Sequence, residues 1–174
     1  MLTIDPLLRA ILDNYQLPWF GVHGLGHWGR VLDNGLRIAE EMAVNPDVVT
    51  LFALFHDSRR VNEDSDPGHG RRGALLAKEL RGSLFELPDK DFNDLFEACV
   101  HHTDGLTEAK LAIQVCWDAD RLDLGRVGVR PHAPLLCTDI AKQPATIEWA
   151  QQRAESEAIS PRVKVLWDEL WQSC

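Results

Sequence analysis

A histidine and an aspartate, His56-Asp57, directly follow the unbroken apolar run Leu51 to Phe55 in this 174-residue chain. A helix that is apolar on every side is a buried helix. A carboxylate at the C-terminal end of such a helix is opposed both by the helix dipole and by burial, so a cation must compensate it. Because an imidazole stands beside the carboxylate, a metal ion is a better candidate than a neighbouring arginine. The pair therefore predicts a metal site.

Two more histidines lie where helices can bring them to this site. His27 falls on the border between the apolar and the polar face of a helix that we expect to run to about Val44. His69 follows Asp66-Pro67, an aspartate cap with proline in the first turn, and so lies in the first turn of a helix that ends at Arg81-Gly82. Each histidine alone is weak evidence of a metal ligand. It becomes a credible one only if other ligand-type residues lie near it in the fold.

A helix predicted over residues 89–102 ends in two histidines. Helical phase places His102 on the flank of the apolar stripe and His101 opposite it. Phase thus favours His102 as the inward residue, although the fraying of helix ends leaves both open.

A further helix, predicted from about residue 108 to residue 124, carries two aspartates near its end. Asp120 lies in the broad apolar sector, whereas Asp118 lies on the narrow polar strip. Since a buried carboxylate needs a partner, Asp120 is the better metal ligand, and Asp118 is expected to face solvent or to support a ligand.

The rest of the chain predicts packing helices and a single domain over residues 1–174. A short helix opens the chain at about 5–15, and two helices at about 145–158 and 161–172 are expected to pack on a core of about residues 20–130. No Gly/Ser-rich or Pro-rich linker divides the sequence. The predicted fold class is all-α, a helical bundle.

Composition excludes several classes of partner. With 27 acidic and 18 basic residues, the net charge of −9 argues against a nucleic-acid or anionic membrane surface. No apolar run is long enough to span a bilayer, and no signal sequence opens the chain. Four scattered cysteines fit reduced thiols, so we expect a soluble, cytoplasmic protein. The sequence leaves the oligomeric state open.

The order histidine, His-Asp and distant aspartate resembles the HD-domain superfamily of metal-dependent phosphohydrolases. The resemblance covers about residues 20–130 and implies an all-α bundle that holds a divalent ion (Mn, Fe, Ni, Co, Zn or Mg) between helices. The ligands that it implies are His27, His56, Asp57 and Asp120. The Ala119-Asp120 pattern agrees with the helix phase.

Two further segments resemble a subgroup of that superfamily with two metals. His69-Gly70-Arg71-Arg72-Gly73-Ala74 resembles the His-x-x-x-Gly-Ala segment of bacterial diadenosine tetraphosphate hydrolases, and His102-Thr103-Asp104-Gly105 resembles their His-Thr-x-Gly. The resemblance implies that Asp57 bridges two ions and that His69 and His102 hold the second. His101-His102 is also similar to cyclic di-GMP phosphodiesterases of the HD-GYP type, but no Gly-Tyr-Pro follows Gly105.

Charged residues after the His-Asp pair supply candidate catalytic and phosphate-binding groups. Glu63 and Asp64 are candidates for acid–base catalysis beside Asp57, and His101 is a further candidate. Arginines bind phosphate oxygens as forks, and a helix N-terminus adds free amides. The predicted phosphate-binding residues are Arg59, Arg60, Arg71 and Arg72. The alternative is that these arginines form surface ion pairs with Glu63, Asp64 and Asp66.

The function that follows is hydrolysis of a phosphate ester or anhydride, in a nucleotide or a small phosphorylated metabolite, by metal-activated water. One alternative is a di-iron oxygenase, because branches of the same superfamily use six such ligands for oxygen chemistry. Another is a non-catalytic ligand-sensing module with a degenerate centre. The intact His27, His56, Asp57 and Asp120 argue against the last.

Overall fold

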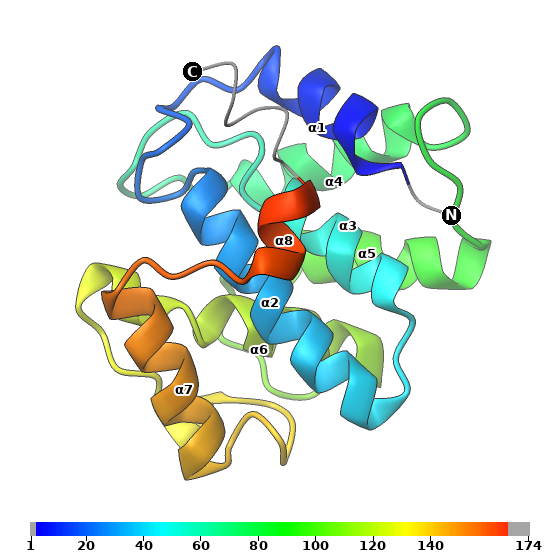
Figure 1. Ribbon diagram of the computed structural model, residues 1–174. Helices are drawn as coiled ribbons and strands as arrows, with labels where there is room; N and C mark the ends of the chain where they lie inside the picture. The colour runs from blue at the N-terminus through cyan, green and yellow to red at the C-terminus, as the bar shows by residue number, and fades with distance from the viewer. Residues whose placement is uncertain (1–2, 167–174) are drawn as a thin grey trace.

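The computed structural model describes residues 3–166, and its regular elements there are helices (Figure 1). The predicted all-α fold is confirmed. Two 3-10 helices are η1 (Leu124–Val127) and η2 (Ala133–Leu135). The α-helices are α1 (Ile4–Leu12), α2 (Leu25–Met42), α3 (Pro46–Phe55), α4 (His69–Leu80), α5 (Asp89–His101), α6 (Leu111–Arg121), α7 (Pro144–Glu155) and α8 (Pro161–Leu166).

Helix α3 is the central element, in contact with α1, α2, α4, α5 and α6. Its residues from Val48 to Phe55 are all buried, as the continuous apolar run predicts. The side chain of Asn45 caps the helix by accepting a hydrogen bond from the Asp47 amide at 3.0 Å. The helix ends at Phe55, so His56 and Asp57 emerge in the interior of the bundle.

Helix α4 begins at His69, two residues later than the Asp66 cap predicts. Asp66 does not cap it: Gly68 is the N-cap, and the Asp66 carboxylate instead accepts hydrogen bonds from the Val61 amide and from Arg72. Gly73 explains the close approach of α4 to the end of α3, since a Cβ at position 73 would collide with the Phe55 carbonyl. This contact places His69 beside Asp57.

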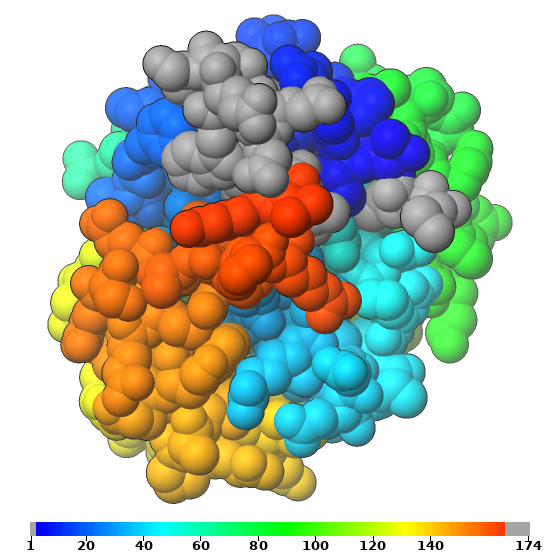
Figure 2. Space-filling model, viewed as in Figure 1, coloured from blue at the N-terminus to red at the C-terminus, as the bar shows by residue number. Residues whose placement is uncertain are grey.

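The first half of the polar face of α2 is covered, whereas Arg37, Glu40 and Glu41 further along the helix are exposed. Asp33 accepts a hydrogen bond from the Ser160 amide at 2.9 Å and pairs with Arg153, and Asn34 donates to the Ala119 carbonyl at 3.0 Å. Figure 2 shows the orange and red segment that contains α7 and α8 lying against the blue α2. The C-terminal helices therefore cover polar groups of α2 as well as apolar ones.

The remaining predicted elements keep their places with shifted ends. The opening helix is Ile4–Leu12, and the helix expected over 145–158 is Pro144–Glu155. The helix expected over 161–172 is described as far as Leu166, and the rest of it lies outside the described residues. Between residues 3 and 166, no helix is both long and apolar enough to cross a membrane. The cysteines described there are free thiols.

Candidate metal centre

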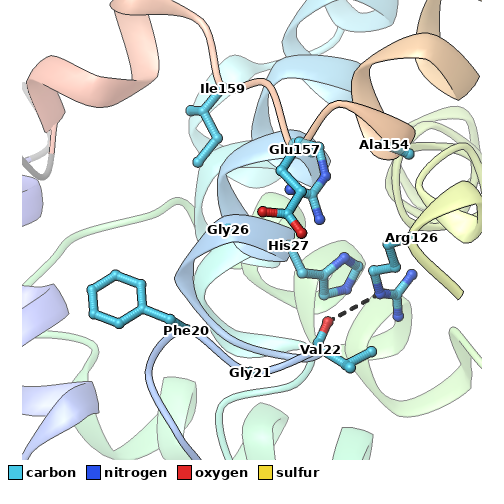
Figure 3. Close-up of a pocket in the computed structure, with 10 residues that line it drawn as sticks. Phe20, Gly21, Val22, Gly26, His27, Arg126, Ala154, Glu157 and Ile159 are labelled. Carbon is cyan, nitrogen blue, oxygen red and sulfur yellow. Dashed lines mark hydrogen bonds between the residues drawn. The ribbon is translucent and has the colours of Figure 1, made fainter.

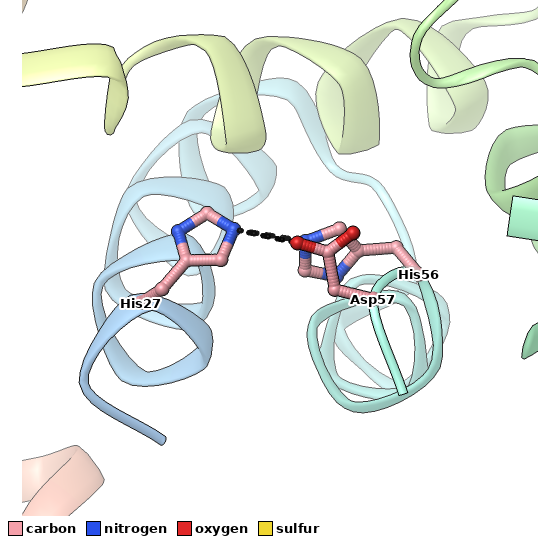
Figure 4. A group of neighbouring side chains, drawn as sticks. All are labelled: His27, His56 and Asp57. Carbon is pink, nitrogen blue, oxygen red and sulfur yellow. Dashed lines mark hydrogen bonds and ion pairs between the residues drawn. The ribbon is translucent and has the colours of Figure 1, made fainter. Parts of the chain in front are cut away.

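Three buried side chains from two helices form a first cluster of possible metal ligands. His27 comes from the first turn of α2, and His56 and Asp57 follow the last turn of α3 (Figure 4). The Asp57 Oδ2 atom lies 3.5 Å from Nε2 of His27 and 3.7 Å from Nε2 of His56. One face of the Asp57 carboxylate thus belongs to this cluster.

The other oxygen of Asp57 belongs to a second cluster, with His69 from α4 and His102 at the end of α5. Its Oδ1 atom lies 3.0 Å from Nε2 of His69 and 3.6 Å from Nε2 of His102. Gly70 permits this packing, because a Cβ at that position would collide with the Cys99 carbonyl and crowd the His102 ring. Asp57 therefore stands between two pairs of imidazoles.

Asp120 of α6 joins the first cluster, and Asp118 does not. The Asp120 Oδ1 atom lies 3.4 Å from Nε2 of His27, and its side chain is 17% exposed, more than that of any other residue of the two clusters. The expectation that Asp118 faces solvent is wrong. Asp118 is fully buried and accepts hydrogen bonds from the amides of Cys137 and Thr138, so it anchors the loop before α7.

Each of the four histidines is fixed through its Nδ1 atom. A ring nitrogen that faces a carbonyl or carboxylate oxygen carries the proton, which leaves a lone pair on Nε2. The Nδ1 partners are Asp123 for His27, the Phe52 and Ala53 carbonyls for His56, the Asp66 carbonyl for His69 and the Cys99 carbonyl for His102.

The lone pairs of these imidazoles converge. Nε2 of His27 lies 3.1 Å from Nε2 of His56, and Nε2 of His69 lies 2.9 Å from Nε2 of His102. Two lone pairs at such a distance repel each other unless a cation lies beside them, and two carboxylates add negative charge. The donor set of four imidazoles and two carboxylates fits a divalent transition metal ion in each cluster.

Burial and charge set the protonation of these groups. Burial lowers the pKa of His56 to about 3, so its imidazole is neutral and ready to bind a metal. Burial alone would raise the pKa of Asp57, but His56, His102 and His69 hold it well below its usual range. The Asp120 pKa is lowered in the same way by His27 and His56, against the effect of burial. Both carboxylates are thus ionised.

A model of the HD domain family matches residues 24–125, more than half of the chain. The chain belongs to the HD domain family. The segment matched contains both clusters in full, from His27 to Asp120. HD domains are metal-dependent hydrolases, and the convergent donor set agrees with that class.

A crystal structure with a similar fold is that of a predicted HD superfamily hydrolase from an uncultured Thermotogales bacterium. It superimposes with a TM-score of 0.65 at 20% sequence identity, over 99% of this chain and 94% of that one. At this identity the likeness shows the HD fold alone. Among curated proteins, none matches the chain.

One of the four predicted phosphate-binding arginines lies at the metal centre of this HD domain. Arg60 is buried, and its Nη1 atom lies 3.2 Å from Nε2 of His69 and 3.4 Å from Oδ1 of Asp57. Arg59 instead donates to the Ile11 carbonyl, and Arg72 donates to the Arg59 carbonyl and pairs with Asp66. The side chain of Arg71 is exposed. These three arginines are not brought to the clusters.

The candidate acid–base residues are placed differently from one another. Glu63 forms a hydrogen bond with Nδ1 of His23, a buried histidine whose ring centre is 6.2 Å from that of His27. Asp64 is exposed and only its backbone carbonyl receives Arg60. His101 is also exposed and pairs with Asp104 at 2.7 Å, on the surface of the HD domain.

Asp123 is the main residue of the site that our sequence reasoning missed. It is buried, and its Oδ2 accepts the hydrogen bond of His27 Nδ1 at 2.7 Å while its Oδ1 accepts that of Arg30 Nε at 2.6 Å. Helical phase could not place it, because α6 ends at Arg121 and a 3-10 helix follows. The available signal was its spacing, one turn after Asp120.

Proposed function

We propose that this HD domain is a metal-dependent phosphohydrolase that acts on a nucleotide or a small phosphorylated metabolite. The observation that carries the proposal is the position of Asp57, with one oxygen beside His27 and His56 and the other beside His69 and His102. A carboxylate between two imidazole pairs suits a site in which two ions act on one phosphoryl group.

The proposed ligands fall into two sets that share Asp57. His27, His56, Asp57 and Asp120 would hold one ion, and Asp57, His69 and His102 would hold the other. The many imidazole nitrogens favour iron, nickel, cobalt, zinc or manganese over magnesium, which prefers oxygen ligands. When bound, such an ion polarises a phosphoryl oxygen and lowers the pKa of a coordinated water toward ~7.

The chain's own residues position and neutralise the substrate. Arg60 presents a buried guanidinium next to Asp57, where it can donate hydrogen bonds to a phosphoryl oxygen. Two backbone contacts hold it there: Nε donates to the Asn62 carbonyl at 3.3 Å, and Nη2 donates to the Asp64 carbonyl at 2.7 Å. A held arginine loses little freedom on binding a phosphate, so it favours tight and directed binding.

We assign proton handling to the pair His23 and Glu63. Glu63 fixes the ring of His23 through Nδ1, and the Tyr15 hydroxyl donates to the His23 carbonyl at 2.8 Å. These contacts hold the His23 ring next to His27 and leave Nε2 of His23 available to exchange a proton. The geometry gives no comparable role to His101 or to the Asp64 carboxylate, which lie on the surface.

The test is a screen of phosphorylated metabolites with protein loaded with each candidate metal. Wild type should release inorganic phosphate, and Asp57→Asn, which keeps the shape but removes the charge, should lose activity together with bound metal. His132→Ala is the matched control, because His132 is exposed in a loop and contacts neither cluster. No phosphate release from any substrate with any metal would reject the proposal.

The same six ligands would also suit a di-iron oxygenase, and the four imidazoles are the observation that keeps this second function open. Iron-loaded protein would then consume oxygen when a substrate is added, and protein loaded with manganese, cobalt or nickel would be inactive. A phosphohydrolase would keep its activity with several of these ions. A protein that only senses ligands would bind phosphorylated compounds without turnover.

A further inference from the structure

A cavity of about 350 Å³ adjoins the metal centre at His27 (Figure 3). We call it the arginine cavity, because Arg30 and Arg126 form part of its wall. The loop before α2 closes one side, and the segment after α7 closes another. Further residues that line it are Phe20, Val22, Gly26, Glu157 and Ile159. Its volume is at the lower end of the range for small-molecule sites.

Arg30 and Arg126 each use two guanidinium nitrogens in hydrogen bonds, and the third nitrogen of each has no hydrogen-bond acceptor among the described residues. Arg30 uses Nε and Nη2 on the Asp123 carboxylate, and Arg126 uses Nε on the Val22 carbonyl and Nη1 on the Asp123 carbonyl. In the described part of the chain, neither Nη1 of Arg30 nor Nη2 of Arg126 has a hydrogen-bond partner. These side chains are only 7% and 10% exposed. Neither nitrogen is among the side-chain atoms of the described residues that are both fully buried and unpartnered, so each reaches solvent and is free to donate to an anion.

Nη1 of Arg30 lies at the wall of the cavity. It would be 3.5 Å from a Cβ built on Gly26, and Gly26 itself lines the cavity. The absence of a side chain at position 26 therefore leaves the space next to this nitrogen open.

Two guanidinium groups, of Arg30 and Arg126, and one carboxylate, of Glu157, line the cavity, so the lining itself carries one net positive charge. Asp123 is the carboxylate that Arg30 and Arg126 both contact, and it also receives His27. Two guanidinium charges thus face one carboxylate charge. Glu157 lines the cavity from an exposed position, and within the described residues it forms no ion pair with either arginine. Its backbone has a φ of 53°, a left-handed conformation that glycine adopts more readily.

The cavity and the metal centre share one imidazole. Nδ1 of His27 contacts Asp123, which holds Arg30, while Nε2 of the same ring lies 3.5 Å from Asp57. His27 therefore belongs both to the lining of the arginine cavity and to the first metal cluster.

We propose that the arginine cavity binds a second anionic group, a phosphate or a carboxylate, of the substrate whose phosphate bond is cleaved at the metal centre. This proposal rests on the proposed phosphohydrolase function. The substrate class is then a small molecule with at least two anionic groups, of which one is cleaved and the other is held by Arg30 and Arg126.

The experiment compares matched substrates in metal-loaded protein: glucose 6-phosphate with glucose 1,6-bisphosphate, and adenosine 5′-monophosphate with adenosine 3′,5′-bisphosphate. Arg126→Gln should lower kcat/KM for the bisphosphates by about 10- to 100-fold, mainly through KM, and change the values for the monophosphates by less than about 3-fold. Gly26→Ala, which narrows the cavity beside Arg30, should show the same selectivity. Arg130→Gln is the control, since Arg130 pairs with Glu148 outside the cavity. Equal effects on both kinds of substrate would overturn the proposal.

A binding measurement separates this proposal from the proposed function. Inorganic phosphate is titrated calorimetrically into Asp57→Asn, which lacks the bridging carboxylate, and into the same variant with Arg126→Gln. Phosphate binding in the first protein and its loss in the second supports an anion site even if no substrate is hydrolysed. Equal binding in both proteins, or none in either, overturns the site. In the active enzyme, inorganic phosphate should compete with bisphosphate substrates more weakly in Arg126→Gln than in wild type; equal inhibition constants in the two proteins would overturn the substrate assignment.

Discussion

The carboxylate of Asp123 accepts a hydrogen bond from Nδ1 of His27 at 2.7 Å. This contact fixes the tautomer of His27 and turns its Nε2 lone pair toward His56, Asp57 and Asp120. Arg30 holds the same carboxylate at 2.6 Å, so the orientation of His27 depends on a buried ion pair with α2 itself.

Replacing Asp123 by Asn should weaken metal binding without removing a ligand. Partners of this kind are worth about 10- to 100-fold in metal affinity. We expect Asp123→Asn to raise the dissociation constant of the first ion by that factor in a competition titration with a chelating dye. Asp104→Asn on the protein surface is the control. An unchanged dissociation constant in Asp123→Asn would show that His27 needs no such support.

Replacing His102 should change the number of metal ions bound per chain, and replacing His101 should not. His102 faces Asp57 and His69, whereas His101 is exposed and pairs with Asp104. We expect His102→Ala to lose one of two equivalents of metal in elemental analysis and His101→Ala to keep both. If His101→Ala lost an equivalent and His102→Ala did not, the inward residue would have been assigned to the wrong histidine.

Arg60, and not Arg71, should bind the substrate's phosphate. Loss of hydrogen bonds to a charged group costs about 1.5–3 kcal/mol, so Arg60→Ala should weaken competitive inhibition by inorganic phosphate by that amount. Arg60→Lys, which keeps the charge but not the fork, should recover part of the loss. Inorganic phosphate should inhibit Arg71→Ala as strongly as wild type, because the side chain of Arg71 is exposed. The opposite order of effects would place the phosphate at the N-terminus of α4.

The helices and the candidate metal ligands could be predicted from the sequence because their signals are local, and the structure brings these candidate ligands together. The apolar run of α3 and the His-Asp pair after it predict a buried helix that delivers two polar groups inward, and the structure shows that arrangement. The structure places Asp120 beside His27, but the reason given for preferring it is wrong: it is Asp118 that is fully buried, and Asp120 lies in the more open position.

The tertiary contacts of polar residues were not readable. Arg30 and Asp33 look like solvent-facing residues in a helical wheel of α2, yet residues about 90 to 130 positions later cover them. Their partners, Asp123 and Ser160, lie in irregular segments where periodicity gives no phase. For the same reason, a cavity wall built partly from Glu157 and Ile159 had no signature in the sequence.

The metal-free protein should lose stability as the pH falls below the ordinary range of histidine. Burial lowers the pKa of His56 to about 3 from 6.5, so below pH 6.5 the unfolded chain binds a proton that the folded chain does not. This contribution to stability is complete above pH 6.5 and is lost as the pH falls toward 3, by about 1.4 kcal/mol per pH unit.

Urea unfolding of the chelator-treated protein between pH 7.5 and pH 4.5 measures this slope. His56→Gln, which removes the titrating imidazole, should unfold with a flatter pH dependence than wild type over the same range. The buried carboxylates Asp57 and Asp120 have lowered pKa values, so their loss of stability falls at lower pH. The raised pKa values of His102 and Asp118 act in the opposite direction, so the difference between wild type and His56→Gln isolates the contribution of His56. An equal pH dependence of the free energy of unfolding in the two proteins would contradict the prediction.

The central claim is that Asp57 holds two metal ions, one on each carboxylate oxygen. Anomalous diffraction from crystals grown with saturating manganese, cobalt or iron tests it most directly. We predict two anomalous peaks for each chain, one among His27, His56, Asp57 and Asp120 and the other among Asp57, His69 and His102, and neither in crystals of Asp57→Asn. A single peak, peaks elsewhere, or peaks that persist in Asp57→Asn would contradict the account.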